Sequence, residues 1–363
     1  MPLKTVLLIV ACTVMVCADR SMADDRYLDS PHNKGTLRLE IDNDVIWSKD
    51  SNFSNGWSLQ YHTRRYARWD DTRTPTLFKW VGNHFPTLGD DDSLVRNGHA
   101  IGQNMFTPGD LTAEVPQEGD LPYAGTLAYS VNWQRFNRRN AANLQFTLGV
   151  LGEESLAENF QKTVHEILNP SDVPQGWDTQ RHSEPIVNIG YTYMVNLWRM
   201  GTVNDGWAGQ LTLEPSASLG NLATMLDLGL SYRFGWNMQE GFATYPAPSG
   251  RGFFQAADLP KPESASPHGI EMVAGLRGSA LIYSVVYDGS LITGDDRDVE
   301  RRTFFLTGLL GFTYHYYRWF SLHLYFQSTT DLLDSDALPE PPPGKEKTQA
   351  DVSYGALMAD FPF

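Results

Sequence analysis

The sequence predicts an all-β fold, a closed antiparallel transmembrane β-barrel of about twelve strands with one amphipathic helix in an extracellular loop. Apolar and polar residues alternate with a period of two along most of the chain. The alternating segments are long, and many of them end in aromatic residues. One segment, 153–169, instead places its apolar residues at helical spacing, so we expect the face formed by Leu156, Phe160, Val164 and Leu168 to be buried.

The alternation is clearest in segments 123–136, 184–198 and 318–328, where the face opposite the apolar one carries mainly polar, uncharged side chains. A tilted strand needs roughly ten residues to cross a bilayer, whereas strands of soluble domains average about five or six. A soluble secreted β-sandwich is the alternative, and strand length and aromatic ends favour the membrane barrel. The aromatic ends are Trp47, Trp57, Trp133, Trp198, Trp207, Trp236 and Trp319.

We expect the strands at twelve places, an even number that closes an antiparallel barrel without a free edge. They are 35–47, 56–66, 98–106, 122–136, 142–151, 184–198, 206–218, 221–236, 267–286, 303–316, 318–328 and 348–361. With both termini in the periplasm, the outer loops are 48–55, 107–121, 152–183, 219–220, 287–302 and 329–347. The long insertions 67–97 and 237–266 then fall on the periplasmic side.

The start of the chain predicts export. Residues 1–23 resemble a signal peptide, with Lys4, an apolar stretch at 6–17 and the small residues of a cleavage site at 21–23. We therefore expect residues 24–363 to form a single barrel domain in the outer membrane of a Gram-negative bacterium. Both cysteines of the chain lie in the signal, which excludes disulfides, thiolate metal sites and cysteine nucleophiles from the mature protein; they are Cys12 and Cys17.

Charge and hydropathy exclude two further classes. The formal net charge of −15 argues against nucleic acid as a partner. Mean hydropathy is −0.35 and no long apolar run follows the signal, which argues against a helical membrane protein.

Candidate chemistry begins at the end of the first strand. Asp42, Asn43 and Asp44 are followed in the next loop by Asp50 and Ser54, and such oxygen donors favour a hard cation such as calcium. A polar turn between two strands is the simpler interpretation of the same residues. Alternation places Asn43 on the outward face near the rim, where an amide is costly unless it is used or covered.

The helical segment 153–169 supplies a candidate base. It carries His165 one turn after Gln161, and its loop leaves the same side of the barrel as the loop 48–55. A neutral imidazole beside a bound cation could deprotonate water for ester hydrolysis. We therefore expect His165 to come close to the group formed by Asn43, Asp44 and Ser54. A surface histidine on a helix that caps the barrel mouth is the alternative.

The order of motifs resembles the lipid A 3′-O-deacylase family of outer-membrane barrels, over about residues 35–363. The matching pieces are Asn43-Asp44, Asp50 with Phe53-Ser54-Asn55-Gly56, Ile101-Gly102-Gln103 with Phe106-Thr107-Pro108, Asp120 with Pro122-Tyr123-Ala124-Gly125, Gly149-Val150-Leu151-Gly152 with Gln161 and His165, Gln175-Gly176-Trp177 with Gln180 and Glu184-Pro185, Leu219-Gly220-Asn221, and the terminal Phe363.

This resemblance implies a carboxylic ester hydrolase that removes the 3′-linked acyloxyacyl chain of lipid A, the anchor of lipopolysaccharide in the outer leaflet, and depends on calcium. It implies that Asn43 and Ser54 lie in the site, that Asp44 lies near the metal and that His165 activates water. The sequence departs from the family in one respect. A lysine that members place shortly after the Thr-Pro motif has no counterpart, because 109–121 contains no Lys or Arg.

Three other interpretations stay open on the sequence. One is a passive porin or structural barrel, which leaves the loop helix and the outward amide of Asn43 unexplained. Another is an outer-membrane phospholipase of the serine–histidine type, for which Ser321 and His323 are available. The third is a barrel of the same family that has lost its activity.

Overall fold

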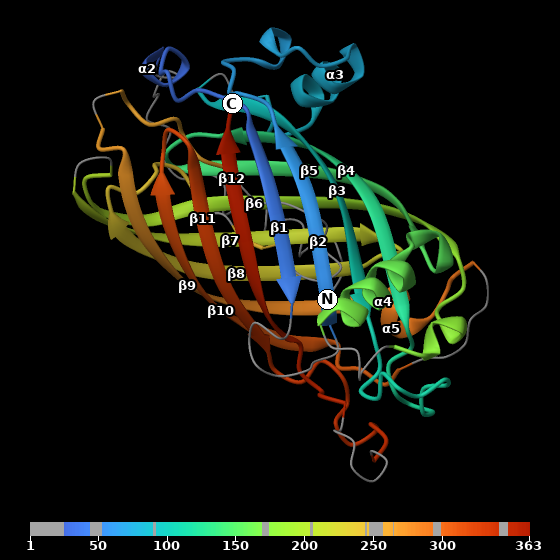
Figure 1. Ribbon diagram of the computed structural model, residues 1–363. Helices are drawn as coiled ribbons and strands as arrows, with labels where there is room; N and C mark the ends of the chain where they lie inside the picture. Colours follow the sequence, from blue (N-terminus) through green and yellow to red (C-terminus); the bar gives the residue numbers. More distant parts are fainter. Residues whose placement is uncertain are drawn as a thin grey trace, which may run out of the picture.

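The structure is a computed structural model that describes residues 25–43, 53–89, 92–168, 174–203, 206–243, 245–246, 257–263, 265–292, 299–340 and 348–363. Within these residues, twelve antiparallel strands form one closed barrel in which each strand pairs with its neighbours in the chain and β1 pairs with β12 (Figure 1). The predicted fold class is confirmed. The predicted signal peptide lies outside the described residues.

The strands fall where the alternation predicts them, with ends that shift by a few residues. They are β1 (Thr36–Asn43), β2 (Phe53–His62), β3 (Leu94–Phe106), β4 (Ala124–Phe136), β5 (Asn140–Leu151), β6 (Glu184–Gly201), β7 (Trp207–Gly220), β8 (Thr224–Trp236), β9 (His268–Tyr283), β10 (Phe304–Tyr316), β11 (Phe320–Thr329) and β12 (Ser353–Pro362). The helices and 3-10 turns are α2 (Asp25–Leu28), η2 (Trp69–Asp71), α3 (Thr76–His84), η3 (Glu153–Ser155), α4 (Ala157–Leu168), η5 (Gly176–Thr179) and α5 (Val285–Asp288).

The parity of each position decides whether its side chain faces lipid or the lumen. On β1, Leu39 and Ile41 are about half exposed on the outer wall, whereas Arg38, Glu40 and Asp42 are buried on the inner face. A shift of one residue in register would exchange the two sets, so the apolar outer face fixes the register. No helix within the described ranges has the length and apolar character to cross a membrane.

The predicted helix 153–169 is interrupted. Leu156 has a left-handed backbone (φ 58°) that separates η3 from α4, and its side chain is 55% exposed. The expectation that Leu156 belongs to the buried face of the helix is therefore wrong. Ala157 takes that place at the start of α4 and is buried against the barrel wall.

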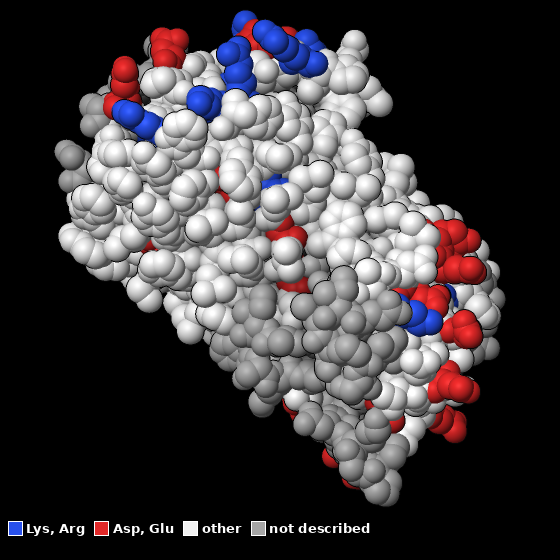
Figure 2. Space-filling view, in the orientation of Figure 1, with Lys and Arg blue, Asp and Glu red and all other residues white. Residues whose placement is uncertain are grey.

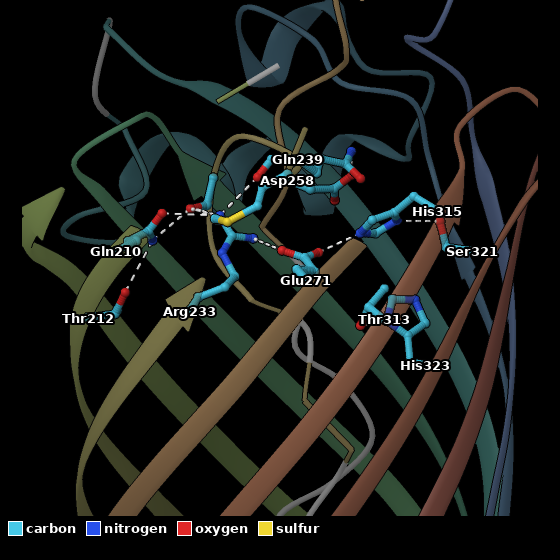
Figure 3. A network of polar contacts seen from close by, with 12 residues as sticks. Gln210, Thr212, Arg233, Gln239, Asp258, Glu271, Thr313, His315, Ser321 and His323 are labelled. Atoms are coloured by element: carbon cyan, nitrogen blue, oxygen red, sulfur yellow. Dashed lines mark hydrogen bonds and ion pairs between the residues drawn. The ribbon is translucent and has the colours of Figure 1, made fainter. Parts of the chain in front are cut away.

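The second long insertion enters the lumen of the barrel. Its residues 239–243 and 257–261 lie among inward-facing side chains, where Asp258 pairs with Arg65 and Arg96 and accepts a hydrogen bond from Gln239 Nε2 at 2.6 Å (Figure 3). The Arg96 Nη2 to Asp258 Oδ1 distance is 2.9 Å. This segment forms a plug, which we define as the described residues 237–243 and 257–263.

The base of the plug is fixed by a buried lysine. Lys261 Nζ donates to Asn237 O, Asn237 Oδ1 and Met238 O at 2.7–2.9 Å, and it lies 4.4 Å from the centre of the Tyr317 ring. At the opposite end of the lumen, the loops form an apolar cluster; its members include Leu281, Val285, Val286, Leu332, Leu333 and Val352. Both ends of the lumen are therefore packed with side chains of the loops.

We expect Asp258→Ala to destabilise the folded barrel by about 3 kcal/mol, because it leaves Arg65 and Arg96 buried without their partner. On electrophoresis, the folded barrel runs as a compact band, and the temperature at which this band is lost should be lower for Asp258→Ala than for wild type. Asp336→Ala, at an exposed position, should leave that temperature unchanged. Equal temperatures for the two variants would contradict the role of the plug anchor.

Acid should weaken the same anchor in the wild-type protein. Burial alone would raise the pKa of Asp258, but the guanidinium groups of Arg65 and Arg96 outweigh burial and hold that pKa below its ordinary value. A lowered folded-state pKa gives stability that is present above about pH 4 and is lost as pH falls through the lowered value. Unfolding temperatures measured from neutral pH into this acid range should therefore fall less for Asp258→Ala than for wild type.

Candidate active site

The loop helix lies on the outside of the barrel. The η3 turn and α4 contact β3 and β4, and Figure 1 shows α4 in front of this part of the wall. Gly125 on β4 makes the contact possible, because a Cβ atom there would collide with Ser155 Oγ and Ala157 Cβ. Behind the helix, a fully buried cluster holds the start of α4 to the wall; it consists of Met105, Tyr123, Ala157 and Trp177.

Polar side chains of the wall clamp the turn before the helix. Trp57 Nε1 on β2 donates to Gln103 Oε1 at 3.0 Å, and Gln103 Nε2 donates to the carbonyl of Ser155 at 2.5 Å. Gln103 faces outward but is buried, because the loop covers it. Under the loop, the outer wall thus carries the polar Gln103 beside the apolar Met105.

Gln161 on α4 has one half of its amide engaged. Its Oε1 accepts a hydrogen bond from Trp177 Nε1 at 2.8 Å, and the side chain is only 2% exposed. Its Nε2 has no hydrogen-bond partner in the described part of the chain. A buried amide donor without a partner is costly, and its presence one turn before His165 suggests a position that receives a ligand oxygen.

The register connects Asn43 to this region. Asn43 is opposite Asn55, Asn55 is opposite Met105 and Met105 is opposite Gly125, so one outward row runs from the end of β1 to the start of α4. Three strand spacings amount to roughly 14 Å. Asn43 lies on the outer face as predicted, in line with Leu39 and Ile41.

The direction of α4 brings its later turns toward that end of the row. Ala157 packs at Gly125 on β4, whereas the ring of Phe160 lies 6.3 Å from that of Trp57 on β2. The helix therefore runs from β4 toward β2, and the backbone of His165 continues in that direction.

The remaining predicted site residues can be placed only in part. The backbone of Ser54 belongs to β2, at a register shift between Phe53 and Asn55, and that of His165 belongs to α4. The side chains of both, and the whole of Asp44 and Asp50, lie outside the described residues. The proximity of His165 to Asn43, Asp44 and Ser54 therefore stays a prediction.

The same limit applies to calcium. Within the described ranges, no three His, Cys, Asp or Glu side chains are grouped so as to hold a metal ion. The chemistry of the expected donors nevertheless fits calcium, because the side chains of Asn43, Asp44 and Ser54 each offer an oxygen atom as a ligand. The observation that bears on the fit is Asn43 itself, an amide on the outer face at the rim.

The lumen contains a second arrangement with chemical potential. Ser321 Oγ lies 2.7 Å from His315 Nδ1, and His315 Nε2 lies 2.5 Å from Glu271 Oε1 (Figure 3). Ser321 thus pairs with His315, directly opposite on β10, and not with His323 as the phospholipase alternative supposes. His323 bonds instead to Thr313.

This lumenal chain is a structural network. Arg233 pairs with Glu271 at 3.3 Å and ties the chain to the plug through its bond to Gln239 O. The neighbouring small cavity is bordered by His315 and Glu271, but Ser321 is not among its lining residues. A membrane lipid would have to enter the plugged lumen to reach it, so the outer wall is the better candidate for lipid chemistry.

The fold and the wall surface together define an outer-membrane β-barrel with a candidate site on its lipid-facing side. The family model of outer membrane protein LpxR matches residues 6–338, and the chain therefore belongs to this family. The resemblance to the lipid A 3′-O-deacylase family and the outer-membrane location are both confirmed.

One of the solved structures that match supports the fold. LpxR from Salmonella typhimurium matches with a TM-score of 0.66 and 16% identity, covering 90% of this chain and 100% of that one. The β domain of the Bordetella autotransporter BrkA matches with a TM-score of 0.41 and 9% identity, covering 91% and 98% of the two chains. A search of curated proteins by sequence finds no match.

The sequence did not predict the hydrogen bonds that hold the loop helix on the wall. Gln103, Gln161 and Trp177 stand in the motifs, but their roles depend on contacts between different strands and loops. The available signal was Gln103 itself, a polar residue at an outward position of a transmembrane strand, which requires a cover or a partner.

We expect Gly125→Val to push η3 and α4 off the wall while leaving the barrel closed, because the new side chain collides with Ser155 and Ala157. Limited proteolysis should cut within 153–168 at least ten times faster, the amount expected from about 1.4 kcal/mol of lost packing. Gly308→Ala is the control, since its Cβ would have only Ser328 O nearby, at 3.9 Å. Equal cleavage of both variants would contradict the contact.

Proposed function

We propose that this protein is an outer-membrane hydrolase that removes the 3′-linked acyloxyacyl chain of lipid A. The observation that carries the proposal is the loop helix, which is clamped on the lipid-facing wall and carries the buried Gln161, whose Nε2 has no partner among the described residues. A site in this place is open to a lipid that stays in the membrane. A site in the lumen would not be.

The wall beside the helix suits acyl chains. Ile41 and Leu59 are 53% and 40% exposed on the outer face of β1 and β2, next to the partly covered Trp57. A lipid whose chains lie along these residues would bring its ester groups to the rim, where Asn43 ends β1. The acidic loop surface near α4, visible in Figure 2, suits a substrate whose phosphates are bridged by divalent cations.

Each residue has a proposed role. His165 takes a proton from water as the water oxygen attacks the ester carbonyl, and the protonated imidazole then gives this proton to the leaving 3′-oxygen as the acyl C–O bond breaks. The amides of Asn43 and Gln161 donate to the oxygen on which negative charge develops. Asp44, with oxygen atoms of Asn43 and Ser54, would hold calcium, which when bound would add positive charge beside that oxygen. The missing lysine after Thr107-Pro108 leaves contact with substrate phosphate to other groups.

The passive porin and the phospholipase are less well supported. The plug occupies the lumen and is held there by the ion pairs of Asp258 with two arginines and by the buried Lys261. A lumen filled in this way is unlike an open pore. The serine–histidine arrangement at Ser321 faces that same closed space. Mass spectrometry of lipid A and of phospholipids, after expression in a host that makes lipid A, distinguishes the three functions.

We expect His165→Gln to lower deacylation by about 10²- to 10⁴-fold, the contribution of a general base, without affecting assembly of the barrel. Mass spectrometry of lipid A should then find the substrate intact. His182→Gln, an exposed histidine of the same loop, should keep full activity. Normal deacylation by His165→Gln would overturn the assignment of the base.

Calcium dependence is tested separately. We expect Asp44→Asn to remain folded but to need much more calcium for activity, because one charged oxygen ligand is lost. Activity should be titrated with calcium after chelation, with Asp336→Asn as the matched exposed control. If the wild-type enzyme were fully active in excess chelator, the metal would have no place in the reaction.

A further inference from the structure

A second helix lies on the outer wall, at the end of the barrel where the C-terminus emerges (Figure 1). The ring of Phe78 on α3 lies 5.0 Å from that of Trp133, and Trp133 Nε1 donates to the carbonyl of Phe78 at 2.9 Å. Phe85 lies 5.8 Å from Tyr191. Trp133 and Tyr191 occupy outward positions of β4 and β6, so α3 covers wall that lipid would otherwise contact.

The helix is held firmly in this position. Trp69 on η2 is 1% exposed and donates through Nε1 to the carbonyl of Leu88 at 2.8 Å, which closes the segment at both ends. The Trp69 ring packs directly under Gly82, where any Cβ atom would collide with it. The segment 69–88 is therefore a rigid platform and not a loose loop.

One stripe of α3 is apolar and uncovered. Leu77 and Trp80 are 66% and 57% exposed, and His84 stacks on the Trp80 ring at 4.9 Å. These residues stand three and four apart and therefore share one face. Lys79 and Asn83, also four apart, share a different face, where they bind the backbone and carboxylate of Asp70 at 2.9 and 3.0 Å.

The exposed stripe adjoins the lipid-facing wall. The outward residues Val131, Trp133 and Leu144 pack against the platform, whereas the next outward row along the strands is uncovered. That row is 41–48% exposed and consists of Ile101, Tyr129, Leu148 and Val187. The uncovered wall is thus only a few residues along the strands from the platform, and α3 lies at the boundary between lipid and water.

Cationic side chains lie in the segment that leads to α3. Arg64 and Arg73 are exposed there, and the exposed Arg68 pairs with Asp71 at 3.4 Å. Figure 2 shows that most Lys and Arg side chains on this face gather at the end carrying α2 and α3, whereas Asp and Glu predominate near α4. Trp and Leu on one side of a helix, with cations beside them, suit the head-group layer of a membrane.

We propose that α3 is an interfacial helix that binds anionic glycerophospholipids. Leu77 and Trp80 insert at the boundary between head groups and acyl chains, and the arginines contact phosphate. With both termini in the periplasm, this is the inner leaflet, opposite to the leaflet that α4 faces. The protein would then contact lipids of both leaflets through two helices on the outside of the barrel, α3 and α4.

A single fluorescent probe tests the proposal. Residues 24–363 contain no cysteine, so Leu77→Cys in that protein gives one site for an environment-sensitive label. In vesicles of phosphatidylcholine and phosphatidylglycerol, we expect the emission of the label at position 77 to be blue-shifted relative to the same label in water. Phospholipids that carry a nitroxide at the head group should quench it. Asn83→Cys, on the water-facing side, should show neither effect.

The role of the arginines is tested by the double variant Arg64→Gln/Arg73→Gln, which should retain less phosphatidylglycerol on purification than wild type. The control is Arg302→Gln, at the other end of the barrel, which should retain as much as wild type. Equal emission and quenching for labels at 77 and 83 would overturn the proposal. So would a blue shift at 77 that increases with protein density and resists lipid quenching, because it would identify a second copy of the chain as the occupant.

Discussion

Closure of β1 on β12 is the constraint on which the rest of the structure depends. Within a bilayer, each unpaired backbone N–H or C=O costs several kcal/mol, so a membrane sheet must have no edge. Thr36 pairs with Pro362 at one end of this seam and Asn43 with Gly355 at the other. Once the seam is closed, the parity of each residue is fixed, and every side chain faces either lipid or the lumen.

Polar side chains therefore have different roles on the two faces of the barrel. In the lumen, many polar groups pair with one another; Arg38 binds Asp360 through two bonds of 2.6 Å, and His315 lies between Ser321 and Glu271. Polar groups on the outer wall have no such reason to exist. Gln103 lies there because the loop covers it. On the covering helix, the buried Nε2 of Gln161 has no partner among the described residues, which points to chemistry at that place.

The strands could be predicted from the sequence because the two faces of a barrel strand require apolar and polar residues to alternate. The order of the strands, the outward position of Asn43 and the loop helix were all accessible in this way. The break at Leu156 was not, because helical spacing says nothing of a single left-handed residue. Neither were the plug and the platform, because Asp258 meets Arg65 across 193 positions, and such contacts depend on how loops fold over a finished barrel.

The site itself could be predicted only as a set of residue types in order. Spacing cannot show that Ser321 prefers His315 to His323, since both face the lumen; the register of β10 and β11 decides it. In the same way, the clamp from Trp57 through Gln103 to Ser155 joins a strand pair to a distant loop. The motifs name the residues expected in the site, and the contacts that hold the loop helix come from the closed barrel.

The central claim is that lipid chemistry occurs on the outer wall under α4. The most direct measurement is cross-linking with a lipid A analogue that carries a photoreactive group on its 3′-linked chain, followed by mass spectrometry of the labelled peptides. We expect label in β1, β2 and α4, near Asn43, Trp57 and Gln161. Label confined to the lumen, on the plug or near Ser321, would contradict the account.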